Sequence, residues 1–250
     1  MSARTVVVIG GAGAIGRAVC ELSAERGDRV VVADLRGAHA VADALPGAGH
    51  EAVEINVTDL ADVERILGPD GSHRGADAIV YAAGVNYTGP VATTDWDAYD
   101  RLMAVNLRGA FHVGKAVSLD LERDPRPVAL VFLSSVAGLH GEGGGSIYCS
   151  TKFGLIGFVQ SLASELARFG ARANSVCPGN VDSPLLRQLA DDVALREGVT
   201  TEGKLREFAG ATAYHRLITL REVAEVCAFL GGPTSSGLSG QTIVVDGPSL

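Results

Sequence analysis

Short apolar runs that alternate with amphipathic segments constrain the fold of this chain more than any other feature. Strands that alternate with helices at this spacing pair in parallel and have helices packed on both faces. The pattern therefore predicts an α/β fold with a doubly wound parallel sheet, whose ligands bind at the carboxyl ends of the strands. The predicted strands are residues 5–9, 29–33, 50–57, 77–81, 128–133, 171–177 and 241–245.

Length and composition fit one such domain spanning residues 1–250. The chain has 250 residues, of which 47% are hydrophobic and 20% charged, enough to bury a large core. Its apolar runs are too short to span a membrane, and the run at residues 5–9 is too short for a signal peptide, so we expect a cytoplasmic protein. The formal net charge of -8 argues against nucleic-acid or membrane partners.

A glycine-rich segment follows the first predicted strand. Gly11, Gly13 and Gly16 form a G-x-G-x-x-G pattern between a strand and a helix. This arrangement permits a tight turn and directs the helix N-terminus toward a pyrophosphate. Asp34 lies 23 residues after Gly11, at the end of the second strand, where its carboxylate can accept hydrogen bonds from a ribose. The alternative is that Asp34 caps a helix at residues 36–45.

Ser135, Tyr148 and Lys152 are the candidate catalytic residues. Tyr148 and Lys152 are one helical turn apart, and an ammonium beside a phenol favours the phenolate, so we expect a lowered pKa for Tyr148. Ser135, at the end of a strand, can hydrogen-bond the oxygen whose proton the tyrosine transfers. Asn106 stands in a helical pattern that begins at Asp95. An amide there indicates either an interrupted helix, a functional side chain or a local backbone bond.

Together these motifs resemble the short-chain dehydrogenase/reductase superfamily from end to end. The ordered set comprises the glycine motif, Val-Asn-Leu around Asn106, Ser134-Ser135, Tyr148-x-x-x-Lys152, Pro178-Gly179 and Val245-Asp246-Gly247. The resemblance implies a single Rossmann-type domain of seven parallel strands, NAD(P)-dependent conversion of an alcohol or ketone, and a homodimer or homotetramer. It assigns catalysis to Ser135, Tyr148 and Lys152. It also implies that Asn106 holds a water that links the lysine to solvent.

The resemblance also implies a set of cofactor-binding residues. They are Gly10, Gly11, Gly13, Ile15, Gly16, Asp34, Asn56, Val57, Ala83, Gly84, Tyr148, Lys152, Pro178, Gly179, Val181 and Ser183. Several neighbouring positions differ from the usual family pattern: Ile9, Ala14, Asn56, Tyr81-Ala82, Ser183 and Pro248. None of these departures removes a catalytic group.

The predicted cofactor is NAD, because the carboxylate of Asp34 would face the 2′-phosphate of NADP. Arg36 and Arg17 are the nearby bases that oppose this choice. Leu35 and Gly13 occupy the two places where NADP-preferring members of the family usually carry a base.

Other kinds of site are not favoured. The six histidines never pair at metal-ligand spacing, no G-x-S-x-G elbow exists, and a P-loop-like pattern at residues 109–115 lies within a predicted helix. Residues 180–216 are polar and weakly periodic, which predicts a substrate-binding lid. His140, Glu142 and Tyr214 are candidates to line the substrate pocket.

Three functions are open at this point. The first is an NAD-dependent oxidoreductase for a secondary alcohol or ketone, with a hydroxylated substrate of modest size. The others are an NADP-dependent ketoreductase and a catalytically silent dinucleotide-binding sensor or scaffold. A sensor has no need of a complete Ser, Tyr, Lys and Asn set, so Ser135, Tyr148, Lys152 and Asn106 favour the enzyme.

Overall fold

The computed structural model describes residues 3–248 and contains one seven-stranded sheet. The strands run in the order β3-β2-β1-β4-β5-β6-β7, and every pairing is parallel. The doubly wound sheet predicted from the alternating pattern is therefore confirmed. The strands are β1 (Thr5–Ile9), β2 (Arg29–Asp34), β3 (Glu51–Glu54), β4 (Ala78–Tyr81), β5 (Ala129–Leu133), β6 (Arg172–Pro178) and β7 (Thr242–Val245).

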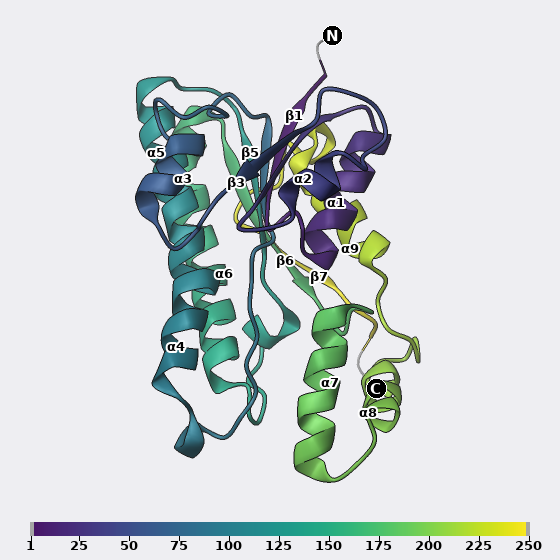
Figure 1. The fold of residues 1–250 in the computed structure, drawn as a ribbon. Coiled ribbons are helices and arrows are strands. Elements are labelled where there is room, and N and C mark those ends of the chain that lie inside the picture. The colour runs from purple at the N-terminus through teal and green to yellow at the C-terminus, as the bar shows by residue number, and fades with distance from the viewer. Residues whose placement is uncertain (1–2, 249–250) are drawn as a thin grey trace.

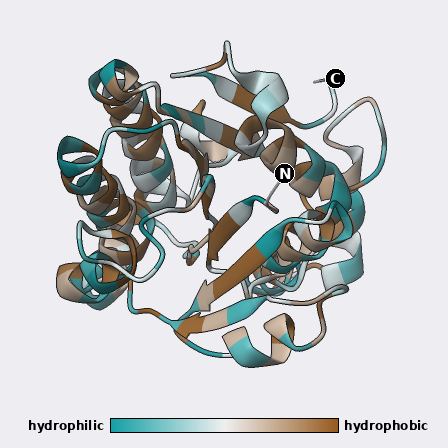
Figure 2. Cartoon of the chain, turned by 90° about the horizontal axis from the view of Figure 1, so that it is seen from above, coloured by the Kyte–Doolittle hydropathy of each residue, from teal (hydrophilic) through white to brown (hydrophobic). Residues whose placement is uncertain are grey.

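Helices cover both faces of the sheet (Figure 1). One layer contains α1 (Ala14–Glu25), α2 (Ala38–Ala42) and α9 (Leu220–Gly231), and the other contains α3 (Leu60–Leu67), α4 (Trp96–Leu102), α5 (Ala110–Arg123) and α6 (Ser146–Leu166). Alternate residues of β1 face opposite layers: Val6 and Val8 pack in one buried cluster, Val7 and Ile9 in the other. The strands accordingly form an apolar centre between the helices (Figure 2).

The strand order reverses at β1, which pairs with β2 on one side and β4 on the other. In open α/β sheets a ligand binds at such a point, beyond the carboxyl ends of the strands. The glycine-rich segment follows the end of β1, and Asp34 ends β2. The loop with Ser135 follows β5, and Pro178 ends β6. The fold thus brings the predicted site residues to one edge of the sheet.

The helical stretch predicted from Asp95 is interrupted around Asn106. Asp95 caps α4, and the chain then forms a π-helix over Met103–Gly109 before α5 begins. A π-helix often marks a functional position because it changes the direction of side chains within a helix. The P-loop-like residues 109–115 lie across the end of this π-helix and the start of α5. They are therefore helical, which agrees with the expectation that they do not form a phosphate-binding loop.

Residues 180–216 differ most from the predicted structure. Instead of an irregular lid they contain α7 (Pro184–Glu197) and α8 (Thr201–Gly210), which pack together and project beyond the sheet (Figure 1). Pro184 at the first helical position and Ser183 as the cap explain why α7 begins there despite its weak periodicity. No helix in residues 3–248 has the length and apolar character to cross a membrane.

Candidate active site

The loop after β5 is packed tightly against α6. The Ser134 hydroxyl donates to the backbone oxygen of Lys152 at 3.0 Å. A Cβ at Gly138 would lie 2.9 Å from the backbone of Lys152, so only glycine allows this approach. Ser135 caps the short turn that follows, its hydroxyl accepting from the Ala137 N–H at 3.1 Å. These contacts hold Ser135 beside the first turns of α6.

Tyr148 and Lys152 share one face of α6, as their spacing predicts. The Lys152 Nζ lies 5.5 Å from the centre of the Tyr148 ring. The lysine is only 4% exposed, and its Nζ donates to the backbone oxygen of Leu133 at 2.8 Å. The ammonium is therefore fixed between the end of β5 and the tyrosine.

The lowered pKa expected for Tyr148 is wrong for this structure. Burial raises the pKa of the phenol to about 12, although the Ser135 hydroxyl acts in the opposite direction. Burial also lowers the pKa of Lys152 to about 8. A low-dielectric site disfavours the charged forms of both groups. At neutral pH the phenol carries its proton, the form that donates.

Asn106 is fully buried and binds the chain that follows β4. Its Oδ1 accepts from the Val85 N–H at 2.8 Å, and its Nδ2 donates to the Val85 oxygen at 2.9 Å. The same Nδ2 donates to the Thr151 hydroxyl at 3.2 Å, which connects it to the helix of Lys152. A Cβ at Gly84 would lie 3.6 Å from Asn106 Oδ1 and 3.8 Å from Lys152 Nζ. Asn106 and Lys152 therefore face the same small space.

Tyr81, one of the departures from the family pattern, supports the π-helix. The side chain is 1% exposed, and its hydroxyl donates to the backbone oxygen of Val105 at 2.5 Å. A Cβ at Gly109 would approach that hydroxyl to 2.5 Å, so glycine makes room for the tyrosine. Tyr81 thus binds a backbone carbonyl of the π-helix next to Asn106.

The glycine-rich segment has the close packing that a phosphate cradle needs. A Cβ at Gly10 would lie 2.4 Å from the Ala83 nitrogen, and one at Gly16 would lie 2.1 Å from the Gly10 oxygen. Gly10 also has a φ of 81°. Gly13 caps α1 without any side-chain hydrogen bond, so the first N–H groups of the helix face outward. This segment fits the pyrophosphate of a dinucleotide.

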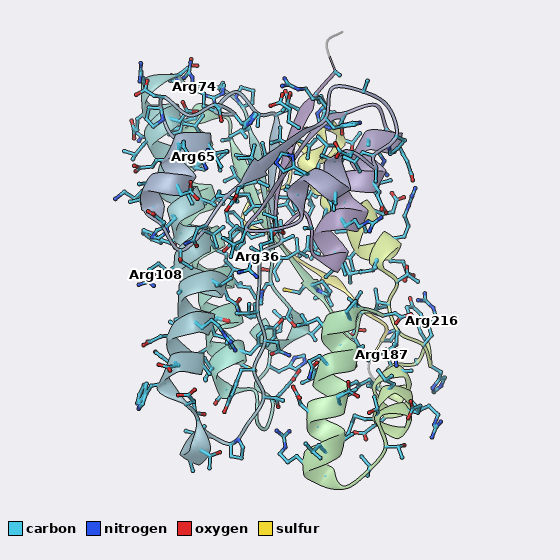
Figure 3. All side chains as sticks on the ribbon, viewed as in Figure 1. Arg36, Arg65, Arg74, Arg108, Arg187 and Arg216 are labelled. Atoms are coloured by element: carbon cyan, nitrogen blue, oxygen red, sulfur yellow. The ribbon has the colours of Figure 1, made fainter. Side chains whose placement is uncertain are left out.

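Asp34 is held at the end of β2 by the glycine-rich segment. Its Oδ2 accepts from the Ala12 N–H at 2.9 Å, and its Oδ1 from the Arg36 N–H at 3.3 Å. The alternative that Asp34 caps the next helix is wrong, because Gly37 occupies the cap of α2. The side chain of Arg36 is exposed near the middle of the molecule as viewed in Figure 3.

Asn56 and Val57 lie further along the sheet edge, after β3. The Asn56 Oδ1 accepts from the N–H and the hydroxyl of Thr58, at 3.1 and 2.8 Å. Val57 is buried and lies against Gly109, and its backbone oxygen is within 2.9 Å of the His112 Nδ1. The amide of Asn56 is exposed, but its carbonyl is already engaged with Thr58.

A cavity of about 420 Å³ opens between the loop after β5, the start of α6 and the pair α7–α8. Seven predicted site residues line it: Ile15, Ser135, Tyr148, Pro178, Gly179, Val181 and Ser183. Position 179 requires glycine, because a Cβ there would lie 2.2 Å from the Asp246 carboxyl carbon. Of the three candidates for the substrate pocket, Glu142 lines the cavity, whereas His140 and Tyr214 do not and are exposed.

The residues that α7 and α8 contribute to the cavity were not among the predicted site residues. Leu186, Leu189 and Val193 form a stripe at helical spacing on α7, and Arg196 continues it at the end of the helix. Lys204 of α8 also lines the cavity. The spacing of the three apolar residues was the signal that could have identified this face.

Comparison with known proteins agrees with this geometry. A family model described as "Enoyl-(Acyl carrier protein) reductase" matches residues 10–247. The 3-oxoacyl-[acyl-carrier-protein] reductase FabG of Escherichia coli is 31% identical over 98% of this chain and 96% of its own length. This chain belongs to the short-chain dehydrogenase/reductase superfamily. It is therefore an oxidoreductase that uses a nicotinamide dinucleotide.

Other members of the superfamily cover the chain equally well. A sorbitol dehydrogenase of Cereibacter sphaeroides is 29% identical over 99% of this chain and 97% of the relative. The structure of actinorhodin polyketide ketoreductase with NADPH superposes with a TM-score of 0.89 at 27% identity, covering 98% of this chain and 96% of that one. The names of these relatives refer to different substrates.

Proposed function

We propose that this protein transfers a hydride between NAD and a secondary alcohol or ketone of modest size. The observation that carries the proposal is the position of Ser135 and Tyr148 at a cavity that Ile15, in the glycine-rich segment, also lines, with the Lys152 Nζ 5.5 Å from the centre of the Tyr148 ring. A tyrosine hydroxyl that faces a cavity beside a buried ammonium can act as a general acid or base. The hydroxyl of Ser135 adds a second contact for the same substrate oxygen.

The proposed roles follow from the contacts of each side chain. Tyr148 gives its proton to the carbonyl oxygen during reduction and takes the alcohol proton during oxidation, while Ser135 holds that oxygen in place. Lys152 lies beside the phenol and favours its deprotonated form when its own ammonium is charged. Asn106 holds Val85 and Thr151 around the space near Lys152, where a water can connect the lysine to solvent.

The cofactor would be held by the sheet edge and the segments that follow it. The segment from Gly10 to Gly16 would hold the pyrophosphate, Asp34 the adenosine ribose, and Pro178 to Ser183 the nicotinamide end. Asn56, Val57, Ala83 and Gly84 complete the proposed set on the adenine and central side. A nicotinamide ring bound there supplies the hydride acceptor or donor. Asp34 supports NAD over NADP, because its carboxylate would repel a 2′-phosphate.

The cavity supports a small, hydroxylated substrate. Its lining mixes Asn86, Thr88 and Asn180 with the apolar stripe of α7, and its volume of about 420 Å³ is at the small end for ligand pockets. Two relatives by name act on polyols, the sorbitol dehydrogenase and a galactitol 2-dehydrogenase of Agrobacterium fabrum that is 28% identical over 98% of this chain. Residues 180–216 serve in this proposal as the substrate-binding lid.

The remaining features of the proposal concern the whole protein. It comprises one catalytic domain of residues 1–250 that assembles into a homodimer or homotetramer. Phe111 and Phe153, exposed by 53% and 45% on α5 and α6, support self-association. The four cysteines are buried and free, which supports a reducing, cytoplasmic location.

The experiment that tests this function is a hydride-transfer assay with a panel of secondary alcohols and both dinucleotides. The absorbance of the reduced nicotinamide reports turnover, and we expect it with NAD and at least one alcohol. The ketoreductase solved with NADPH favours NADP as the second candidate. Faster turnover with NADP than with NAD would establish that alternative, and tight dinucleotide binding without any turnover would establish a sensor.

A further inference from the structure

Arg196 is the cation of the cavity whose charge is not neutralised by the surrounding protein. It lies at the end of the cavity-lining stripe of α7 and is exposed at the cavity mouth. Within residues 3–248 no carboxylate lies within 4.0 Å of its guanidinium. Its hydrogen bonds go from Nη1 and Nη2 to one neutral acceptor, the Thr88 hydroxyl, both at 3.3 Å. These bonds are long and leave most of its five donors unused.

The other charged groups of the cavity have a different arrangement. Lys204 is 5% exposed, and its Nζ lies 2.6 Å from a Glu197 carboxylate oxygen and 2.8 Å from one of Glu207. That cation is therefore already paired. Glu142 lines the cavity on the side of Tyr148, and its charge contributes to the raised pKa of the phenol. An anion next to the reacting carbon would meet Glu142, whereas one near Thr88 would meet Arg196.

The glycine-rich turn at residues 143–145 leaves space beside the guanidinium. A Cβ at Gly144 would lie 3.4 Å from the Thr88 hydroxyl and 3.5 Å from the Arg196 Nη2, so the backbone there is close but carries no side chain. Arg196, Thr88 and this turn come from three separate segments that meet at the mouth of the cavity. A planar guanidinium in such a position suits two parallel hydrogen bonds to an oxyanion.

We infer that the substrate is anionic and that Arg196 binds its carboxylate or similar oxyanion while the reacting carbon lies at Tyr148. This inference rests on the proposed function, because it specifies the substrate class of the same cavity. The orientation follows from the charges: Glu142 disfavours the anion beside the phenol, whereas Arg196, whose hydrogen bonds within residues 3–248 go only to the Thr88 hydroxyl, has donors free to bind it. The substrate class is thus a hydroxy acid or keto acid, with the apolar stripe of α7 along its chain.

The test compares secondary alcohols that differ only in a terminal carboxylate. Hydroxy acids of increasing length, from 3-hydroxybutyrate to 5-hydroxyhexanoate, are each paired with the corresponding amide. We expect the best acid to exceed its amide in kcat/KM by ~10- to 100-fold, the range for a charge-assisted hydrogen bond. Arg196→Met should reduce that ratio to near 1, while Arg196→Lys should keep part of it. The loss should lie mainly in KM.

Arg187 provides a matched control on the same helix. It is exposed on α7 (Figure 3) but does not line the cavity, so Arg187→Met removes the same charge without changing the acid preference. An equal effect of the two substitutions would overturn the inference and indicate long-range charge alone. Turnover of amides as fast as of acids by the wild-type enzyme would also overturn it while leaving the proposed function intact.

A binding measurement separates this inference from the proposed function. Calorimetry with butyrate and butyramide reports on the anion site without turnover, and we expect the wild-type protein to bind butyrate at least ~10-fold more tightly. Arg196→Met should remove this difference. If hydride transfer failed with every alcohol but the butyrate preference persisted, the function would be wrong and the anion site right. Equal binding of butyrate and butyramide would contradict the anion site.

Discussion

Replacing Asp34 with asparagine should relax the preference for NAD without disturbing the glycine-rich segment. The Asp34 Oδ2 accepts from the Ala12 N–H at 2.9 Å, and an asparagine Oδ1 can accept the same bond. The variant therefore removes the charge and keeps this bond, and it loses only the longer bond of 3.3 Å from the Arg36 N–H. Asp34→Ala removes both, so it should also weaken the binding of NAD itself.

The size of the effect follows from the repulsion between Asp34 and a 2′-phosphate. At about 4 Å and an effective dielectric of about 20, one pair of like charges costs roughly 4 kcal/mol. Asp34 is half-buried, and solvent screening reduces this repulsion to about 2–3 kcal/mol. We therefore expect Asp34→Asn to raise the ratio of kcat/KM for NADP to that for NAD by ~30- to 150-fold.

The assay compares kcat/KM for the two dinucleotides with one alcohol, for wild-type protein and both variants. A third variant concerns Arg36, because this residue is exposed two residues away and is the cation best placed to meet a phosphate. Arg36→Leu in the Asp34→Asn background should lower the rate gained with NADP. A wild-type preference for NADP, or an unchanged ratio in Asp34→Asn, would refute the reasoning.

Two further predictions concern the contribution of buried side chains at the site to the stability of the fold. Burial lowers the pKa of Lys152 from 10.5 to about 8, so below pH 8 the folded state carries the full cost of burying an ammonium. This cost disappears as the pH rises toward 10.5, where the lysine is neutral in both the folded and the unfolded state. Lys152→Met removes the cost and should therefore stabilise the fold most below pH 8. The difference in unfolding free energy from wild type, measured in urea, should shrink by about 3 kcal/mol across that window, and a constant difference would contradict the burial argument. Tyr81→Phe removes the hydrogen bond to the Val105 carbonyl and should cost about 0.5–1.5 kcal/mol of unfolding free energy. An unchanged denaturation midpoint would show that water replaces the hydroxyl.

Much of the fold follows from local patterns in the sequence. The first strand has the predicted bounds, residues 5–9, because its apolar run determines them locally. The helix α9 begins at a cap formed by residues close in sequence, because the Thr219 and Glu222 side chains bond each other's backbone N–H groups. The seven parallel strands agree with the superfamily resemblance, whereas periodicity alone identifies strands without ordering them.

The rest depends on contacts between distant segments. The π-helix around Asn106 forms because Tyr81 and Val85, from another part of the chain, bind its polar groups. The raised pKa of Tyr148 arises from burial, which residue spacing does not reveal. Arg196 enters the site only because α7 folds over the cavity, and its charge matters only because no carboxylate within residues 3–248 pairs with it.

The substitution Tyr148→Phe tests the proposed chemistry most directly. It removes one hydroxyl at the cavity and should lower kcat by ~10²- to 10⁴-fold, the usual range for a general acid or base, while the dissociation constant of NAD changes by less than about two-fold. Tyr87→Phe removes another tyrosine hydroxyl that lines the cavity and should leave kcat within about ten-fold of wild type, outside the acid–base range. A Tyr148→Phe enzyme that kept more than about a tenth of the wild-type kcat would contradict the assignment of Tyr148 as the proton-transferring group.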